Sequence, residues 1–505
     1  MPEPPQTRSR KNRRYRPLMI VGTASEVGKS FICTGILRYL SQEGFYPAPF
    51  KAQNMSLNSY ATPEGGEMGR AQAIQAEACG LKGHTNMNPI LLKPQNEQES
   101  QLILHGNLVG KRQAKSYFLG EDKDLLFEEA YKAFTQLQNS YEPIVIEGAG
   151  SISELNLKHK DITNLRMALA TQADVYLIAD IDRGGVFGSL YGTLELLSPE
   201  EKTSIKGIII NKFRGDPQLF SAARTQIEDL VQKPIMGILP YNPDLRIPEE
   251  DSVSLETKSF RPRKNKKNIG IVMFRYLSNY TDFHPLEQLE DIHIFYSDNP
   301  KDLEQVDILI LPGTKNTMQE MLWMRQNGVA SVILQAWKTG KTVIGICGGY
   351  QLMGRSLHDP HHVEGNIHTL PGLGIFPTQT SLERIKQVGQ KIFKFRKDPR
   401  PCTGYEIHMG NTKILPDHPV SPAVWMDDLP HGYSQGSAWG CYLHGIFENE
   451  AVVKHLLQGR KKIPSYAQEK ENKYDQLAHM LSQHLPLKKM ISQLEENTDP
   501  IPNPL

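Results

Sequence analysis

The chain has 505 residues, 39% of them hydrophobic, so it can bury sizeable cores, and its length predicts two or three domains. Its 57 basic and 56 acidic residues nearly cancel, which argues against nucleic acid or a membrane surface as the main partner. No apolar run is long enough to cross a membrane, no signal-peptide core is visible, and the five widely spaced cysteines form no C-x-x-C pair. We therefore expect an intracellular, cytoplasmic protein without a disulfide framework or a thiolate zinc site, in which a lone cysteine can carry chemistry.

Short apolar runs alternate with helical patterns in the first half of the chain. A basic arm, residues 1–16, precedes them with the stretch SRKNRRYR; it could touch phosphates but is more typical of a solvated tail, and we assign it no function. Fully apolar strands alternating with helices indicate a parallel sheet covered on both faces. We predict a doubly wound α/β domain over residues 17–255. Its expected strands are residues 17–22, 142–148, 173–180, 206–212 and 235–240.

A second α/β unit follows a change of composition. Residues 256–268 are polar, basic and without periodicity, as expected of a linker. The next apolar runs predict another doubly wound domain over residues 269–460, and the charged segment 461–505 predicts a helix followed by a frayed end. The expected strands of this second domain are residues 269–274, 292–297, 306–313 and 341–349.

The stretch IVGTASEVGKS, residues 20–30, resembles a phosphate-binding loop with one extra residue. Five residues separate Gly22 from Gly28, where the pattern G-x-x-x-x-G-K-S/T has four. A loop that leaves a strand at Gly22, passes Thr23 and enters a helix near Gly28 turns its backbone N–H groups toward one point, where an anion is favoured. Lys29 would then pair with the β- and γ-phosphates of ATP and Ser30 would hold Mg²⁺. An ordinary glycine-rich turn with a helix cap is the alternative.

Two later residues favour the nucleotide site. Glu147, at the end of the strand-like run IVIEG, lies where a second magnesium-holding carboxylate belongs in such folds. Asn211, at the end of IIINK, is placed to contact a base edge, although an internally satisfied strand-end asparagine is the alternative. The loop is similar to that of the dethiobiotin synthetases, which carry the longer spacing, and this resemblance implies activation of a carboxylate by ATP.

A second chemical centre is predicted in TVIGICGGYQLMG, residues 342–354. Cys347 stands between an apolar strand and a helical pattern and is followed by two glycines, which is the cysteine version of a nucleophile elbow. A buried strand cysteine is the alternative. The base that such a nucleophile needs is offered by His444 in CYLHGIFEN, with His431 and the histidines of residues 358–362 as competitors.

This half resembles the class I, triad-type glutamine amidotransferases, whose domain is flavodoxin-like. The resemblance implies that Cys347 attacks the glutamine side chain and releases ammonia, with Gly313 of LPGTKNT and Gly348 as oxyanion donors. One position departs from the family pattern His-x-Glu, because Ile446 stands where the glutamate is expected. We therefore predict a Cys347–His444 dyad, oriented by another acceptor or by a backbone carbonyl. Glu448 is the obvious substitute, although a solvated carboxylate suits its position better.

Together the two halves specify a reaction in which a carboxylate becomes an acyl phosphate and ammonia converts it to an amide. The segments FKAQNMSLNSY (50–60), MGRAQAIQAEACG (68–80), NPILLKP (88–94) and DIDRGGVFGS (180–189) closely resemble the cobyric acid synthase family. The resemblance implies ATP-, Mg²⁺- and glutamine-dependent amidation of the b, d, e and g carboxylates of adenosylcobyrinic acid a,c-diamide in cobalamin biosynthesis. A polyanionic corrinoid needs cations and amide donors. The matching motifs supply Lys51, Gln53, Asn54, Asn58, Arg70, Lys93 and Arg183, and the resemblance adds Glu154 and Asp161 from a substrate-side loop.

Three other interpretations compete with this one. The related cobyrinic acid a,c-diamide synthases share both domains, but the segment KAQNMSLNS favours the first family. A ParA-like switch ATPase with a binding domain would lack glutaminase activity, and a structural protein with a decayed amidotransferase half would not need an intact elbow. The expected partners are the corrinoid substrate and glutamine, with no nucleic acid or membrane and with homo-oligomerisation left open.

Overall fold

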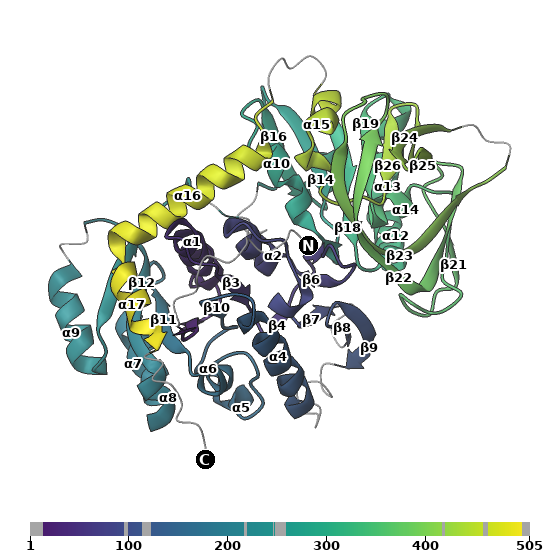
Figure 1. The fold of residues 1–505 in the computed structure, drawn as a ribbon. Coiled ribbons are helices and arrows are strands. Elements are labelled where there is room, and N and C mark those ends of the chain that lie inside the picture. The colour runs from purple at the N-terminus through teal and green to yellow at the C-terminus, as the bar shows by residue number, and fades with distance from the viewer. Residues whose placement is uncertain are drawn as a thin grey trace.

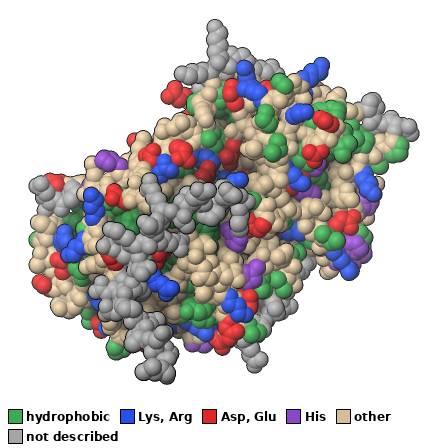
Figure 2. All heavy atoms as spheres, viewed as in Figure 1, with side chains coloured by type: hydrophobic (Ala, Val, Ile, Leu, Met, Phe, Trp, Pro, Cys, Tyr) green, Lys and Arg blue, Asp and Glu red, His purple; other side chains and the backbone are tan. Residues whose placement is uncertain are grey.

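The computed structural model describes residues 14–94, 99–113, 123–216, 220–245, 247, 259–416, 420–457 and 463–496, and it has two α/β domains, as the sequence predicts (Figure 1). Most of the basic arm and the first three residues of the expected linker lie outside these residues. Within the described ranges, no helix is both long and apolar enough to span a bilayer. On the face drawn in Figure 2, acidic and basic side chains are interspersed, in keeping with the near-neutral composition.

The first domain is built on a six-stranded parallel sheet in the order β13-β12-β11-β2-β10-β3. All five predicted runs form strands of this sheet, and every residue of β2 and β10 is buried. The carboxyl ends of parallel strands meet at one edge, which is where ligands bind in open α/β sheets. Its strands are β2 (Leu18–Gly22), β3 (Ala48–Phe50), β10 (Ile144–Glu147), β11 (Asp174–Asp180), β12 (Ile205–Phe213) and β13 (Ile235–Pro240).

Helices cover this sheet, and two small separate sheets lie toward the second domain (Figure 1). The helices are α1 (Lys29–Gln42), α2 (Arg70–Ala78), η1 (Thr85–Met87), α4 (Lys123–Gln138), α5 (Leu155–Lys158), α6 (Leu165–Thr171), α7 (Val186–Glu195), α8 (Pro199–Ser204) and α9 (Ser221–Val231). The added strands are β4 (Gln53–Met55), β7 (Ile90–Pro94), β8 (Glu99–Leu104) and β9 (Asn107–Gln113) in one sheet, and β5 (Ser59–Ala61) with β6 (Glu67–Gly69) in another.

The second domain has a mixed sheet whose parallel part runs β16-β14-β17-β19-β26. An antiparallel part continues it through β25 and β24 to the long β22–β23 hairpin. The parallel strands are β14 (Lys267–Val272), β16 (Ile292–Ser297), β17 (Ile308–Leu311), β19 (Thr342–Ile346) and β26 (Ala438–Cys441). The remaining strands are β15 (Leu277–Ser278), β18 (Gly313–Thr314), β20 (Ser356–His358), β21 (Thr369–Pro371), β22 (Thr378–Phe395), β23 (Cys402–Ile414), β24 (Ser421–Met426) and β25 (Leu429–Gln435). The helices are η4 (Tyr280–Phe283), α10 (His284–Glu287), α11 (Pro300–Leu303), α12 (Thr317–Gln326), α13 (Val329–Lys338), α14 (Gly348–Leu352), η5 (Ile446–Glu448) and α15 (Glu450–Leu456).

The C-terminal segment returns from the second domain to the first. Helix α16 (Tyr466–His484) runs along α1, and α17 (Leu487–Leu494) follows it (Figure 1). Leu481 of α16 packs so closely on Gly35 of α1 that a Cβ there would lie 2.4 Å from Leu481 Cδ1. Strand β27 (Glu495–Glu496) then pairs with β1 (Arg14–Tyr15). The sequence predicts a helix and then a frayed end, but the described residues after α16 complete the apolar core around α1.

Candidate active site

Cys347 occupies a strained turn between β19 and α14. Its φ of 50° and ψ of −108° lie in a region that side-chain-bearing residues rarely adopt. The two glycines that follow allow the turn to pack. A Cβ on Gly349 would lie 2.0 Å from the carbonyl oxygen of Leu311, and one on Gly348 would lie 2.7 Å from Thr314 Cγ2. The local sequence therefore forms the nucleophile elbow that it predicts.

His444 follows β26, the strand next to β19, so it reaches the same edge of the sheet as Cys347. Its Nδ1 lies 2.7 Å from Asp282 Oδ2, and its ring hydrogen-bonds the Cys347 thiol. Asp282 Oδ1 also accepts a hydrogen bond of 3.0 Å from the backbone N–H of Gly445. Burial alone would lower the pKa of His444, but the charges of Asp282 and Cys347 and the hydrogen bonds to both raise it to about 10. The arrangement favours the charged imidazolium form of His444.

The other acceptor that the sequence leaves open for His444 is thus a carboxylate from another part of the chain, and the three side chains have the arrangement of a triad. Asp282 lies in η4, 162 residues before His444, and both side chains are almost fully buried. Glu448, the substitute suggested by the sequence, instead pairs with Arg70 at 3.2 Å and Lys470 at 3.3 Å. The only local signal for Asp282 is an acid among apolar and aromatic neighbours, and no spacing relates it to His444.

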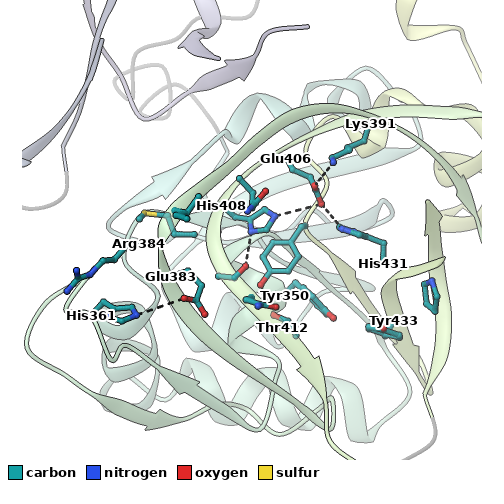
Figure 3. Close-up of a pocket in the computed structure, with 17 residues that line it drawn as sticks. Tyr350, His361, Glu383, Arg384, Lys391, Glu406, His408, Thr412, His431 and Tyr433 are labelled. Atoms are coloured by element: carbon teal, nitrogen blue, oxygen red, sulfur yellow. Dashed lines mark hydrogen bonds and ion pairs between the residues drawn. The ribbon is translucent and has the colours of Figure 1, made fainter. Parts of the chain in front are cut away.

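The competing histidines lie elsewhere. His431 Nε2 is 3.0 Å from Glu406 Oε1, and His408 also points toward Glu406 (Figure 3). These side chains line a cavity of about 640 Å³ between β22, β23 and β25, which adjoins the pocket of Cys347 because His408 lines both. His358 bonds to the hydroxyl groups of Ser356 and Thr369. These contacts join the competing histidines to side chains other than Cys347, whereas His444 lies beside it.

The pocket beside Cys347 lies at the boundary between the domains. Gly348 and His444 line it from the second domain, and Lys93 and Gln101 line it from the first. Gly313 is packed against the site, because a Cβ there would lie 3.1 Å from His444 Cε1. The first domain therefore forms part of the wall around the nucleophile.

The predicted phosphate loop connects β2 to α1. Gly28 has a φ of 100°, which turns the chain into the helix at Lys29. Lys29 Nζ donates to the carbonyl oxygens of Ala24 at 3.0 Å and Gly150 at 2.8 Å, so the lysine lies across the loop. The backbone N–H of Thr23 donates to Ile178 O at 3.0 Å. A strand, a tight loop and a buried lysine at a helix start are the features that a phosphate-binding loop requires, and binding by these residues stays a prediction.

Ser30 and Glu147, the two predicted magnesium ligands, are in contact. Ser30 Oγ donates to Glu147 Oε1 at 2.8 Å, Lys51 Nζ lies 2.9 Å from the same oxygen, and Gln75 donates to Oε2. Burial would raise the pKa of Glu147, but Lys51 and these hydrogen bonds lower it. No group of three histidine, cysteine or acidic side chains forms a metal cage among the residues described. Hard oxygen ligands from one hydroxyl and one carboxylate fit Mg²⁺, which takes its other ligands from phosphates and water.

Asn211 lies near the end of β12 and supports the loop from behind. Its Nδ2 donates to Val27 O at 2.8 Å, and it lies against Gly28, where a Cβ would be 2.2 Å from Nδ2. This is the internally satisfied asparagine that the sequence left as an alternative. A contact with a base edge stays a prediction.

Several predicted substrate residues lie together at the domain boundary. Lys93 Nζ, which is almost fully buried, donates to Glu67 Oε1 at 2.7 Å and to Ser59 Oγ at 2.8 Å. Asn58 is also buried, and its carbonyl oxygen accepts from the backbone N–H of Arg70 at 3.2 Å. Both residues are thus buried and hydrogen-bonded to other residues of the protein.

Gln53 and Asn54 lie on β4, just after Lys51. Asn54 Nδ2 donates to Gln72 Oε1 at 3.1 Å, and Gln53 accepts a long hydrogen bond of 3.5 Å from Lys123.

The remaining substrate candidates are Arg183, Glu154 and Asp161. Arg183 pairs with Glu26 of that loop at 2.9 Å, and 72% of its side chain is exposed. Glu154 is exposed just before α5, while Asp161 accepts hydrogen bonds from the backbone N–H groups of Thr163 and Asn164. The structure thus brings Lys51 to Glu147 and Arg183 to the loop, and gives Asp161 a local structural partner.

Comparison with known proteins matches both domains. Residues 18–255 match the model of the CobQ/CobB/MinD/ParA nucleotide binding domain, and residues 268–452 match that of the CobB/CobQ-like glutamine amidotransferase domain. A cobyric acid synthase from Parabacteroides distasonis is 49% identical over 490 residues, covering 95% of this chain and 99% of the relative. The chain belongs to the cobyric acid synthase family.

Other members of this family are similar over the same length. A cobyric acid synthase from Bacteroides fragilis is 48% identical, covering 96% of this chain and 100% of that protein, and one from Salmonella arizonae is 38% identical, covering 96% and 99%. These matches confirm the recognised family, the two-domain α/β fold, and a glutamine amidotransferase-type ligase of cobalamin biosynthesis. They also confirm a nucleotide-binding domain and a glutaminase domain on one chain.

Proposed function

We propose that this protein amidates the b, d, e and g carboxylates of adenosylcobyrinic acid a,c-diamide, using ATP, Mg²⁺ and glutamine. In each round the γ-phosphoryl group of ATP passes to a carboxylate oxygen, which gives an acyl phosphate and ADP. Cys347 attacks the glutamine side-chain carbonyl, and ammonia leaves with a proton from His444. Water then hydrolyses the thioester to glutamate. Ammonia displaces phosphate from the acyl phosphate, and an amide remains.

One observation carries this proposal: the pocket of the nucleophile is walled partly by Lys93 and Gln101 of the ATP-side domain. A glutaminase whose cysteine faces the synthetase domain can release ammonia toward the acyl phosphate. A switch ATPase with an unrelated binding domain would have no use for this arrangement, nor for the buried contact of Cys347, His444 and Asp282.

The proposed roles in the glutaminase half follow from the contacts. Asp282 fixes the tautomer and orientation of His444 and stabilises its charged form, because it accepts from Nδ1 at 2.7 Å in a buried site. Gly313 and Gly348 supply backbone N–H donors for the oxyanion of the tetrahedral intermediate. Both glycines pack tightly beside the reacting residues, so their backbones can approach the substrate.

On the ATP side, Lys29 exchanges the carbonyl oxygens of Ala24 and Gly150 for phosphate oxygens when the nucleotide binds. Ser30 and Glu147 would hold Mg²⁺, which neutralises the charge that develops on the transferring phosphoryl group. Gly22, Thr23 and Gly28 shape the loop, and Asn211 holds it in place from β12.

For the corrinoid, Lys51 and Arg183 lie nearest to the phosphate loop through Glu147 and Glu26. We assign them, with Gln53 and Asn54 of β4, to the binding of the substrate carboxylates and amides. The other candidates in this role are Asn58, Lys93, Glu154 and Asp161. A cytoplasmic location and a homo-oligomer also stay predictions.

The test is to incubate the protein with ATP, Mg²⁺, glutamine and the a,c-diamide, and to follow the corrinoid by mass spectrometry. Each conversion of acid to amide lowers the mass by one unit, and four successive steps are expected. Cobyrinic acid without the two amides serves as the competing substrate, since preferential amidation of that compound at two positions would assign the chain to the related diamide synthases. ATP hydrolysis without glutamate release or amide formation would overturn the proposal.

A further inference from the structure

Arg70 reaches from the first domain to the loop that carries the catalytic histidine. It is the first residue of α2, and its side chain is only 11% exposed. Its Nη2 lies 3.2 Å from Glu448 Oε1, and its guanidinium carbon lies 5.9 Å from the ring centroid of Tyr405 and 5.4 Å from that of Tyr60. Glu448 and Tyr405 belong to the second domain, so a single buried cation joins the two halves here.

Both partners of Arg70 in the second domain are coupled to His444. The rings of Tyr405 and His444 stack with centroids 5.4 Å apart and an angle of 26° between their planes. Their backbones also pair, since the N–H of His444 donates to Tyr405 O at 2.8 Å and that of Tyr405 donates to His444 O at 3.1 Å. Glu448 ends the short helix η5 that begins two residues after His444. We call residues 444–448 the His444 segment. Arg70 therefore contacts the last residue of this segment, Glu448, and the tyrosine that packs on its histidine, Tyr405.

The C-terminal half of α2 is held by side-chain contacts, which fix the position of the helix that carries Arg70. Gln75 donates to Glu147 Oε2, and Glu77 near the end of the helix accepts from Lys470 of α16. Lys470 Nζ also lies 3.3 Å from Glu448 Oε2, so Glu448 is held by two cations. Burial would raise the pKa of Glu448, but Lys470 and Arg70 lower it, and the carboxylate stays charged.

We propose that Arg70 is a positioning residue for glutamine hydrolysis: it holds the His444 segment in its working geometry from the other domain, through Glu448 and Tyr405. This inference rests on the proposed glutaminase reaction of Cys347. It replaces the role in substrate binding that the sequence suggests for Arg70, because the guanidinium is buried against two tyrosine rings and a carboxylate. A hydrogen bond to a charged group in a buried site has a strong geometric preference, so its loss lets the segment shift relative to Cys347.

The experiment compares Arg70→Gln with a matched control, Arg38→Gln, in the full-length protein. Arg38 lies on α1 and binds Asp475 and Glu471 of α16, so this control also removes a cation that bridges two segments, but none that contacts the His444 segment. Glutamate release gives kcat and KM for glutamine, and amide formation from ammonium salt reports on the synthetase half alone. The conservative variant Arg70→Lys, Glu448→Gln and the double variant Arg70→Gln/Glu448→Gln complete the set.

For Arg70→Gln we expect kcat for glutamate release to fall about fivefold to tenfold, with KM for glutamine changed less than about twofold and ammonium-driven amidation kept. Arg70→Lys restores part of the loss and Arg38→Gln shows none. The double variant loses less than the product of the two single losses, because both changes break the contact between Arg70 and Glu448. Full glutaminase activity of Arg70→Gln, an equal loss of ammonium-driven amidation, or multiplicative losses in the double variant would each overturn the inference. Failure of the proposed function gives different results: the wild-type protein releases no glutamate, or Cys347→Ser releases as much glutamate as the wild-type protein.

Discussion

Replacing Asp282 with asparagine tests the catalytic geometry most directly. The carboxylate uses both oxygens as acceptors, Oδ2 for His444 Nδ1 at 2.7 Å and Oδ1 for the N–H of Gly445 at 3.0 Å. An asparagine can accept at only one of these positions, and its amide nitrogen must face the other donor. The substitution therefore removes the charge that stabilises the imidazolium and also loses one of the two contacts that orient it.

The structure sets the size of the expected effect. A hydrogen bond to a charged group contributes about 1.5–3 kcal/mol, which corresponds to a loss of roughly tenfold to 150-fold. In serine proteases, the same change of the triad aspartate lowers kcat by about 10⁴. Because the Asp282–His444 contact is almost fully buried, we expect kcat for glutamate release to fall by about 10²-fold to 10⁴-fold.

The assay measures glutamate release and ammonium-driven amidation side by side. In Asp282→Asn, ammonium-driven amidation stays within about twofold of the wild-type rate, because the synthetase half needs only ammonia. Glu448→Gln separates the two carboxylates, since a loss of less than about tenfold is expected there. Asp307→Asn is a control of the same chemistry in the same domain, where Asp307 accepts from the backbone N–H of Asn268. A loss below threefold for Asp282→Asn, or an equal loss for Glu448→Gln, would refute the assignment of Asp282 as the third member of the triad.

Four further predictions concern the nucleophile, the phosphate loop, the pH dependence of stability and helix α16. Cys347→Ser abolishes glutamine-driven amidation and spares the reaction with ammonium salt, whereas loss of both would make the cysteine structural. Lys29→Ala lowers ammonia- and glutamine-driven turnover together, because both need the phosphoryl group, and full ATP-dependent activity in this variant would contradict the phosphate loop. The pKa of His444 is raised from 6.5 to about 10 in the folded state, so the stability this gives is complete below about pH 6.5 and is lost as the pH rises through 10. Denaturant titrations should thus show the difference in unfolding free energy between wild type and Asp282→Asn shrinking over that range, and a constant difference would exclude the linkage. Leu481→Ala, which opens a cavity between α16 and α1, lowers the unfolding free energy by about 2–5 kcal/mol, and a change below about 0.5 kcal/mol would show that α16 is not part of the core.

The sequence by itself determined the parts of this protein that depend on neighbouring residues. Apolar runs bounded by turn residues predict the parallel strands of both sheets, and the phosphate loop and the elbow at Cys347 follow from glycines whose backbone positions admit no larger side chain. Glu147 ends β10, Cys347 directly follows β19, and His444 comes three residues after β26, so the direction of the strands places them at the carboxyl edges of the two sheets, where ligands bind in open α/β folds.

Only the tertiary structure decided which side chains pair with the buried charged residues and which helices cover the core. Asp282 approaches His444 from 162 residues away, Arg70 crosses to Glu448, and α16 returns to cover α1. Any of the 56 acidic residues could have filled the place left by Ile446, since a buried charge requires a partner but not a partner at a fixed spacing. Local patterns encode backbone shape, whereas the pairing of buried charges depends on which elements the packed domains bring together.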